Sequence, residues 1–477
     1  MDKEDRYGMF RNVMLLSATN VLVMALTVIT KPVLARLVGP AEYGIFALTL
    51  GTANLLQGFI LSFHQAGFDF YTPNAGKNAR RLLYSELVAV VATLALLAVP
   101  LWLFFKPVSS LDDTQFLLVM AAAGIIAAMN IVTFFYRATE DFKRMSLIMA
   151  GFGLLSTIAV LAAGYFARSG LVAFAVRTYL VAGLVTVAAI IAIRYTGWAL
   201  ADIRRFFAYS LPLALSNIMT SLISMVDRYF LAAMVSISAV GSYDVAYTIA
   251  TAGLGFSSAL NHVLFPKMRR NIQKISDYAS KSALVLTLLL SVLSLGLFYY
   301  SDIIVNLVLG AGYRGSEGIV KIICLSVPLT GIYGIMGSAL LNLSKQKVVG
   351  LLVVFQAAVF ILLNALLVPR FAGEGSALAL LATTAAVTVA ATAYFAVRQG
   401  CALRRTALVY ALFLCAALPF FAFPQRFDFA VKTAAVLAFL AATFLLNRDV
   451  YFEALDGVKR ISHGMRERLA NFKLGYS

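Results

Sequence analysis

Long apolar runs alternate with short polar segments along almost the whole chain. Most of these runs reach about 20 residues, which is the length that an α-helix needs to cross the hydrocarbon core of a bilayer. The pattern therefore predicts an all-α, polytopic membrane protein with about 14 transmembrane helices. The predicted spans are residues 9–30, 43–63, 82–105, 115–136, 145–166, 170–193, 209–233, 240–264, 278–300, 318–343, 348–368, 375–397, 406–423 and 429–447.

Composition and charge agree with this class. Of the 477 residues, 61% are hydrophobic and only 13% are charged, as is typical of membrane proteins. The net charge of +17 would suggest a nucleic-acid partner for a soluble protein. Here most lysines and arginines fall in alternate connecting segments, which become the inner segments when both termini are placed inside. This asymmetry follows the positive-inside rule, so we expect membrane lipids and no nucleic acid as partners.

The most polar membrane stretch runs from Ser210 to Tyr247. Its charged residues are Asp227, Arg228 and Asp244. An unpaired charge at the centre of a membrane helix costs roughly 3 kcal/mol or more. Helical spacing places three further polar residues on the face that ends in Arg228, namely Asn217, Ser221 and Ser224. We expect this face to border a water-filled cavity rather than lipid.

A weak internal repeat relates the two halves of the chain. A shift of 197 residues brings Asn20 onto Asn217, Lys31 onto Arg228 and Gly44 onto Gly241. The shift covers six predicted spans, an even number, so both copies have the same orientation. Parallel repeats with a site between them are a transporter architecture. We predict two six-helix lobes, residues 1–200 and 201–400, around a central cavity, with accessory spans in 401–447 and a basic cytoplasmic tail at 448–477.

Basic residues within the membrane are the strongest candidates for substrate binding. They are Lys31, Arg36, Arg177 and Arg228. A cavity lined by such residues suits an anionic substrate, because phosphate accepts charge-assisted hydrogen bonds. Other roles stay open, since Lys31 and Arg36 can extend to the outer head groups. Arg228 can pair with Asp227 or Asp244 as a structural lock, and the divergence of adjacent helical residues makes Asp244 the better partner.

The acidic and amide residues have two interpretations each. Asp227, Asp244 and Glu86 are candidates for carrying a coupling proton or ion, and a structural role fits them equally well. Asn20 and Asn217 either line the cavity or join neighbouring helices.

No enzymatic constellation is predicted. The three histidines, His64, His262 and His463, are far apart, and the three cysteines, Cys324, Cys401 and Cys415, show no paired spacing. The sequence has neither a phosphate-binding glycine loop nor a nucleophile elbow. We therefore expect no catalytic residue, no cofactor and no metal.

Three stretches resemble the polysaccharide transporter family, which includes the Wzx-type O-antigen flippases. They are LARLVGPAEYGIFAL (34–48), YSLPLALSN with VDRYFLAAMVSISAVGSYDVAY (within 209–247), and LLNLSKQKVVG with LLNALLVPRFAGEGSALA (within 340–379). The resemblance covers most of residues 1–400. This family belongs to the multidrug/oligosaccharidyl-lipid/polysaccharide exporter superfamily, together with the lipid II flippase and the multidrug and toxin extrusion antiporters.

The resemblance implies two six-helix lobes around a V-shaped cavity, in a multi-pass protein of the bacterial cytoplasmic (inner) membrane. It implies a flippase that moves an undecaprenyl-pyrophosphate-linked oligosaccharide to the outer leaflet by alternating access, for O-antigen, capsule or exopolysaccharide synthesis. A polysaccharide polymerase and chain-length proteins would be its partners. Cavity cations of the family are thought to engage the sugar-phosphate head group, and Lys31, Arg36, Arg177 and Arg228 match them by depth, without a strict motif.

Two other functions remain open at this point. The first is a cation-coupled multidrug antiporter of the same superfamily. Cationic drugs prefer an acidic cavity, so the excess of basic residues argues against it, whereas Asp227, Asp244 and Glu86 keep it open. The second is a membrane polysaccharide polymerase or ligase, which the short outer loops and the missing reactive cluster argue against.

Overall fold

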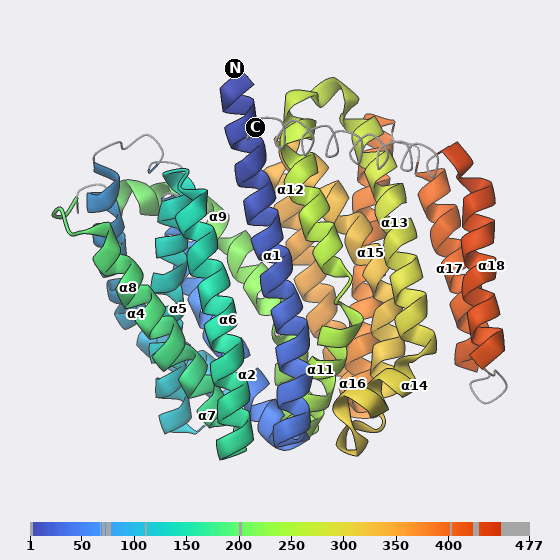
Figure 1. The fold of residues 1–477 in the computed structure, drawn as a ribbon, viewed down its shortest axis with the longest axis horizontal. Helices are drawn as coiled ribbons and strands as arrows, with labels where there is room; N and C mark the ends of the chain where they lie inside the picture. The colour runs from blue at the N-terminus through green and yellow to red at the C-terminus, as the bar shows by residue number, and fades with distance from the viewer. Residues whose placement is uncertain are drawn as a thin grey trace, which may run out of the picture.

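The computed structural model describes residues 3–66, 68, 72, 78–109, 112–199, 203–400, 403–422 and 429–449. All regular structure in these residues is helical, and Figure 1 shows long helices packed side by side. Among the described residues, nine helices are long and apolar enough to cross a membrane, or ten if the bent pair Ile203–Leu211 and Ala214–Ile223 is one span. The chain is thus an all-helical, multi-pass membrane protein, and the finer count of fourteen spans stays a prediction. Cys401 and the tail from residue 450 onward lie outside the described residues.

The first half of the chain forms the helices drawn in blue to green at the left and, for α1, in the middle of Figure 1. The turn between its first two helices is set by Gly39, with φ 84°, followed by proline at the first helical position. Asp112 closes a capping box at the start of α5, and Asp141 caps α6. The elements are α1 (Lys3–Val38), α2 (Pro40–Ser62), α4 (Ala79–Ser109), α5 (Asp113–Ala138), α6 (Phe142–Ala167), α7 (Gly170–Ala175), the π-helical segment η3 (Val176–Ala182) and α8 (Gly183–Ile193).

The second half lies on the right of Figure 1, with the last two helices at its edge beside α13. Helix α16 contains two helices that meet at Ala372, whose φ is 48° and ψ −126°. The elements are α9 (Ile203–Ile223), α10 (Val226–Met234), α11 (Ile237–Ala250), α12 (Leu254–Arg270), η5 (Ile272–Lys274), α13 (Ile275–Tyr299), α14 (Ser301–Ile304), η6 (Val305–Leu309), η7 (Ala311–Tyr313), α15 (Ser316–Asn342), α16 (Gln346–Gln399), α17 (Arg404–Ala422) and α18 (Phe429–Leu446).

Two predicted spans are not continuous helices. The span predicted at 209–233 breaks between Ile223 and Val226, and the span predicted at 240–264 breaks between Ala250 and Leu254. At the first break the Ser224 hydroxyl donates to the carbonyl of Ser221 at 2.6 Å. Serine side chains that bond nearby carbonyls compete with the helical pattern in this way. The chain therefore enters α10 just before its charged residues.

Contacts between the two halves come in reciprocal pairs. A Cβ atom at Gly44 would lie 2.0 Å from the carbonyl oxygen of Ile237, and one at Gly241 would lie 2.1 Å from that of Pro40. Gly44 and Gly241 are 197 residues apart, and so are Pro40 and Ile237. Such exchange of partners is what a two-fold relation between two similar units produces. Only glycine lets α2 and α11 approach so closely.

The same exchange recurs further along these helices. A Cβ atom at Gly58 would meet the side chain of Ser221, and one at Gly255 would meet the side chain of Met24. These two pairs are again related by the shift of 197 residues. The halves thus pack on one another along α1, α2, α9, α11 and α12.

More contacts join the halves at the end of the bundle that holds the α1–α2 turn, which we call the predicted outer end. Arg36 Nη1 donates to the carbonyl of Leu307 at 2.8 Å. The Tyr313 hydroxyl donates to the carbonyl of Ala35 at 3.0 Å. Burial raises the pKa of the Tyr313 phenol, so this group stays protonated and keeps its donor.

Candidate functional site

A group of four charged residues, three of them buried and one, Lys31, partly exposed, joins the two halves near the predicted outer end. We call it the ion cluster. Arg228 Nη2 lies 2.8 Å from Asp244 Oδ1, and Arg228 Nη1 lies 2.8 Å from Asp227 Oδ1. Lys31, from the other half, places its Nζ 3.0 Å from Asp244 Oδ2. Asp244 therefore accepts from a cation of each half. Two cations face two carboxylates, which offsets the cost of burying each charge alone.

Three tyrosines surround the ion cluster and contact its charged groups. The Tyr43 hydroxyl, on α2, also donates to Asp244 Oδ2 at 2.9 Å. The guanidinium of Arg228 lies over the rings of Tyr243 and Tyr247, 5.6 and 4.9 Å from their centres. Such cation–π contacts add to the stabilisation of a desolvated arginine.

The predicted pairing of Arg228 with Asp244 is found, but the expected preference over Asp227 is not, because Arg228 binds both. Its Nη1 reaches both oxygens of Asp227, at 2.8 and 2.9 Å. The chain breaks just before Val226, so Asp227 lies in the first turn of a new helix. There the long arginine side chain can turn back to its neighbour and still reach α11. The expected preference requires one continuous helix through residues 209–233, which the break before Val226 rules out.

A small cavity adjoins the ion cluster on the side of the first half. Its volume is about 80 Å³, room for two or three water molecules at about 30 Å³ each. It lies between α1, α2, α6 and η3, and we call it the Lys31–Arg177 cavity. Its polar lining residues are Thr27, Thr30, Lys31, Ser156, Thr157 and Arg177.

Arg177 differs from the cations of the ion cluster. It lies in the π-helical segment η3, a kind of helix irregularity that is frequent at functional sites. Its guanidinium carbon is 5.2 Å from the centre of the Phe152 ring. Among the described residues it has no hydrogen-bond or ion-pair partner. Its donors are therefore available to a ligand in the cavity.

The remaining predicted residues lie elsewhere. Arg36 is exposed and bound to Leu307, outside both the cluster and the cavity. The predicted polar face of the Ser210–Tyr247 stretch is interrupted, because α9 ends before Arg228. None of the four polar residues assigned to the cavity lines the Lys31–Arg177 cavity. They are Asn20, Asn217, Ser221 and Ser224.

Glu86 belongs to a second buried site that the sequence analysis missed. His64 Nδ1 lies 2.9 Å from Glu86 Oε1, and His64 Nε2 lies 2.8 Å from Thr93 Oγ1. The side chains of His64 and Glu86 are both fully buried, at 0% exposure. The ring of Phe207, on α9, packs edge-on against His64, 4.6 Å between centres. The sequence could have indicated this contact, because His64 and Glu86 both lie near the inner ends of consecutive antiparallel spans.

Comparison with known proteins gives the family. The model of the polysaccharide biosynthesis protein family matches residues 9–272, more than half of the chain. The chain belongs to this family. A protein named as an O-antigen transporter in Escherichia coli strain K12 is 23% identical over 417 residues, covering 80% of this chain and 96% of that protein. A protein named as a low-salt glycan biosynthesis flippase in Haloferax volcanii is 25% identical over 191 residues, covering 39% of this chain and 40% of that protein.

Solved structures of transporters share the fold. A lipid II flippase, MurJ, in an inward closed conformation gives a TM-score of 0.73 at 14% identity, covering 92% of this chain and all of that one. An outward-facing multidrug transporter of the MATE family gives 0.59 at 13% identity, covering 81% of this chain and 95% of that one. All of these relatives are transporters or flippases. On that ground the expectation that the chain is not an enzyme is confirmed. The resemblance to the polysaccharide transporter family is confirmed by the family match, and the solved structures show that the chain shares the fold of the superfamily.

Proposed function

We propose that the protein is a flippase that moves an undecaprenyl-pyrophosphate-linked oligosaccharide from the cytoplasmic to the outer leaflet of a bacterial inner membrane. The observation that carries this proposal is the pair of cations, Lys31 and Arg177, that line one cavity beside the interface between the halves. Guanidinium and ammonium groups bind phosphate oxygens through charge-assisted hydrogen bonds. The names of the two relatives, an O-antigen transporter and a glycan flippase, support the same substrate class.

The proposed architecture has two parallel lobes, residues 1–200 and 201–400, each with six spans, followed by accessory spans in 401–447 and a cytoplasmic tail. The reciprocal contacts of Gly44 with Ile237 and of Gly241 with Pro40 support it. In such an architecture the lobes rock about a site at their interface. Both termini would then lie in the cytoplasm, as the distribution of basic residues predicts.

The proposed mechanism is a competition between Asp244 and the phosphate groups of the substrate for Lys31. A cavity of about 80 Å³ is too small for a pyrophosphate with its sugars, so the site has to widen when the substrate enters. Phosphate oxygens near Arg177 would also attract Lys31, whose Nζ lies 3.0 Å from Asp244 Oδ2. Asp244 would keep Arg228, a partner from its own half. Loss of the Lys31–Asp244 bond would then weaken the connection between the halves at the predicted outer end.

The antiporter alternative has less support. A cationic drug needs a carboxylate that is free to bind it. Asp227 and Asp244 are both engaged by Arg228, and Asp244 also by Lys31.

The test uses cells that lack their own copy of the gene and express variants at equal membrane levels. Arg177→Ala removes a guanidinium that has no hydrogen-bond or ion-pair partner in the described part of the chain. Surface polysaccharide should fall by on the order of ten-fold or more, because a hydrogen bond to a charged group contributes about 1.5–3 kcal/mol. Arg177→Lys should restore part of it. Arg168→Ala, at the exposed end of α6, is the matched control and should leave export unchanged. Normal surface polysaccharide with Arg177→Ala would exclude the proposed role of this cavity.

A further inference from the structure

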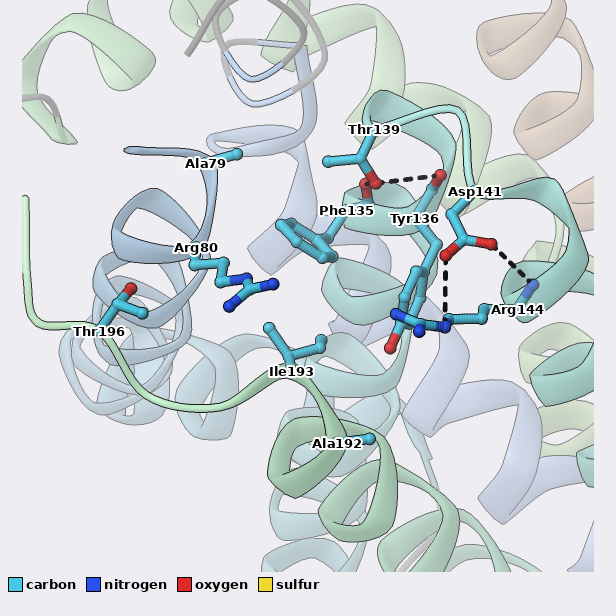
Figure 2. Close-up of a pocket in the computed structure, with 10 residues that line it drawn as sticks. All are labelled: Ala79, Arg80, Phe135, Tyr136, Thr139, Asp141, Arg144, Ala192, Ile193 and Thr196. Carbon is cyan, nitrogen blue, oxygen red and sulfur yellow. Dashed lines mark hydrogen bonds and ion pairs between the residues drawn. The ribbon is translucent and has the colours of Figure 1, made fainter. Parts of the chain in front are cut away.

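A second, larger pocket lies at the opposite end of the first half, where inner loops are predicted. It has a volume of about 540 Å³ and is formed by the ends of α4, α5, α6 and α8 with the segment that follows α8. Figure 2 shows Arg80 and Arg144 approaching it from two sides, with Phe135 and Ile193 on its apolar wall. Neither the ion cluster nor the Lys31–Arg177 cavity shares a residue with it.

The charge of this pocket is not balanced within the described residues. Arg144 Nε lies 3.3 Å from Asp141 Oδ2, and Asp141 also caps α6 by accepting from the backbone N–H of Arg144. Arg80 has no hydrogen-bond or ion-pair partner among the described residues, and in Figure 2 its guanidinium points into the pocket. One carboxylate therefore faces two guanidinium groups. The pocket carries an excess positive charge that suits an anion.

The rim of the pocket has the side chains of a membrane–water interface. Thr196 lines the pocket, and its neighbours Tyr195 and Trp198 are exposed, with ring centres 5.4 Å apart. Exposed tryptophan and tyrosine gather at the level of the lipid head groups. Arg81 Nε holds this segment by donating to the carbonyl of Thr196 at 3.2 Å. Arg80 and Arg144 are thus expected at the depth of phosphate groups.

We propose that this pocket binds the phosphate group of an anionic phospholipid of the inner leaflet, with Arg80 and Arg144 as its ligands. Basic pockets between transmembrane helices on the cytoplasmic side take lipid head groups in this way. Free phosphate and soluble phosphate esters offer the same chemistry. The apolar wall of Phe135 and Ile193 favours the lipid, because glycerol and acyl carbons can pack on it. The bound lipid would hold the ends of four helices of the first half together.

The test measures binding and stability of the full chain purified in detergent. Phosphatidylglycerol, phosphatidylcholine and inorganic phosphate are added in separate arms. Bound lipid is counted by native mass spectrometry, and the apparent unfolding temperature is recorded. We expect phosphatidylglycerol to be retained and to raise the unfolding temperature, and we expect neither effect from phosphatidylcholine. Arg80→Gln should weaken retention of phosphatidylglycerol on the order of ten-fold, since a charge-assisted bond is lost.

Matched variants distinguish binding in this pocket from non-specific attraction of anionic lipid to a basic surface. Lys143→Gln removes the same charge from an exposed residue of α6 that does not line the pocket, and it should retain the lipid as the unmodified protein does. Arg80→Lys keeps the charge and should bind with an intermediate affinity. If Arg80→Gln without lipid unfolds at the same temperature as the unmodified protein, its loss of lipid reflects binding and not misfolding.

Three outcomes would overturn the proposal. Equal loss of lipid in Arg80→Gln and Lys143→Gln would mean non-specific attraction to a basic surface. Stabilisation by inorganic phosphate that depends on Arg80, without stabilisation by phosphatidylglycerol, would mean a site for a soluble phosphate. No difference between Arg80→Gln and the unmodified protein in any arm would mean that the pocket binds neither ligand.

Discussion

The ion cluster and the His64–Glu86 pair are both polar groups in the interior of the protein, but they join different parts of it. His64 and Glu86 both come from the first half and have 0% exposure. The ion cluster takes Lys31 from the first half and its other three members from the second. Lys31 keeps 25% of its side chain exposed and lines a cavity.

This difference decides which group can change partners while the protein stays folded. For Glu86 to exchange His64 for another partner, α4 would have to separate from the end of α2 within the first half. Lys31 can leave Asp244 by moving toward the cavity, and Asp244 still keeps Arg228 and Tyr43. A buried charge that loses every partner is costly, whereas one that retains some is not. The ion cluster is therefore suited to rearrangement, and the His64–Glu86 pair to stabilising one half.

The largest effect is expected from Arg228→Ala. The substitution leaves Asp227 without its cation and Asp244 with only Lys31 and the Tyr43 hydroxyl, and breaking a buried pair costs about 3–5 kcal/mol. We expect a clear fall in the apparent unfolding temperature of the purified protein, together with loss of export. Arg168→Ala serves as the control. An unfolding temperature equal to that of the unmodified protein would show that the cluster does not stabilise the interface.

A smaller effect is expected from His64→Ala. It leaves the Glu86 carboxyl buried without its partner, at a cost of about 1–3 kcal/mol. Because the pair lies within one half, the distance between the halves at the predicted outer end should not change. Spin labels on Arg168→Cys and Arg314→Cys, in a chain whose native cysteines are replaced, would measure that distance. A changed distance in His64→Ala would mean that this pair also acts across the interface.

The smallest loss of stability is expected from Lys31→Met. Partly exposed ion pairs contribute up to about 1 kcal/mol, and Asp244 keeps two other partners. The same spin labels should nevertheless report a larger population with separated outer ends, since a bond between the halves is gone. Thr27→Val, in the same cavity but outside the cluster, is the matched control. Identical distance distributions in Lys31→Met and the unmodified protein would contradict a role for Lys31 in holding the halves together.

Much of the fold could be predicted because membrane helices leave a strong signal. Apolar length located the helices, and the mixed charges of Asp227, Arg228 and Asp244 marked a paired location. The break before Val226 could not be predicted, since no glycine or proline lies at that point and competing serine hydroxyls give a weak signal. Hydrophobic periodicity also does not tell which helices are neighbours.

The contacts that could not be predicted join residues that are far apart in the sequence. Lys31 and Asp244 meet across the interface between the halves, and Arg80 and Arg144 meet at the ends of separate helices. The shift of 197 residues did carry some of this information. It matched Lys31 with Arg228, and both bind the same carboxylate group. An internal repeat can thus indicate residues that meet near its axis.

The central claim is that an anionic head group draws Lys31 from Asp244 and lets the outer ends of the halves separate. The most direct test adds a polyprenyl pyrophosphate to the protein labelled at Arg168→Cys and Arg314→Cys and records the distance distribution by pulsed electron paramagnetic resonance. The account predicts a shift to longer distances in the unmodified background and no shift in Arg177→Gln. An unchanged distribution in the unmodified background, or an equal shift in Arg177→Gln, would contradict it.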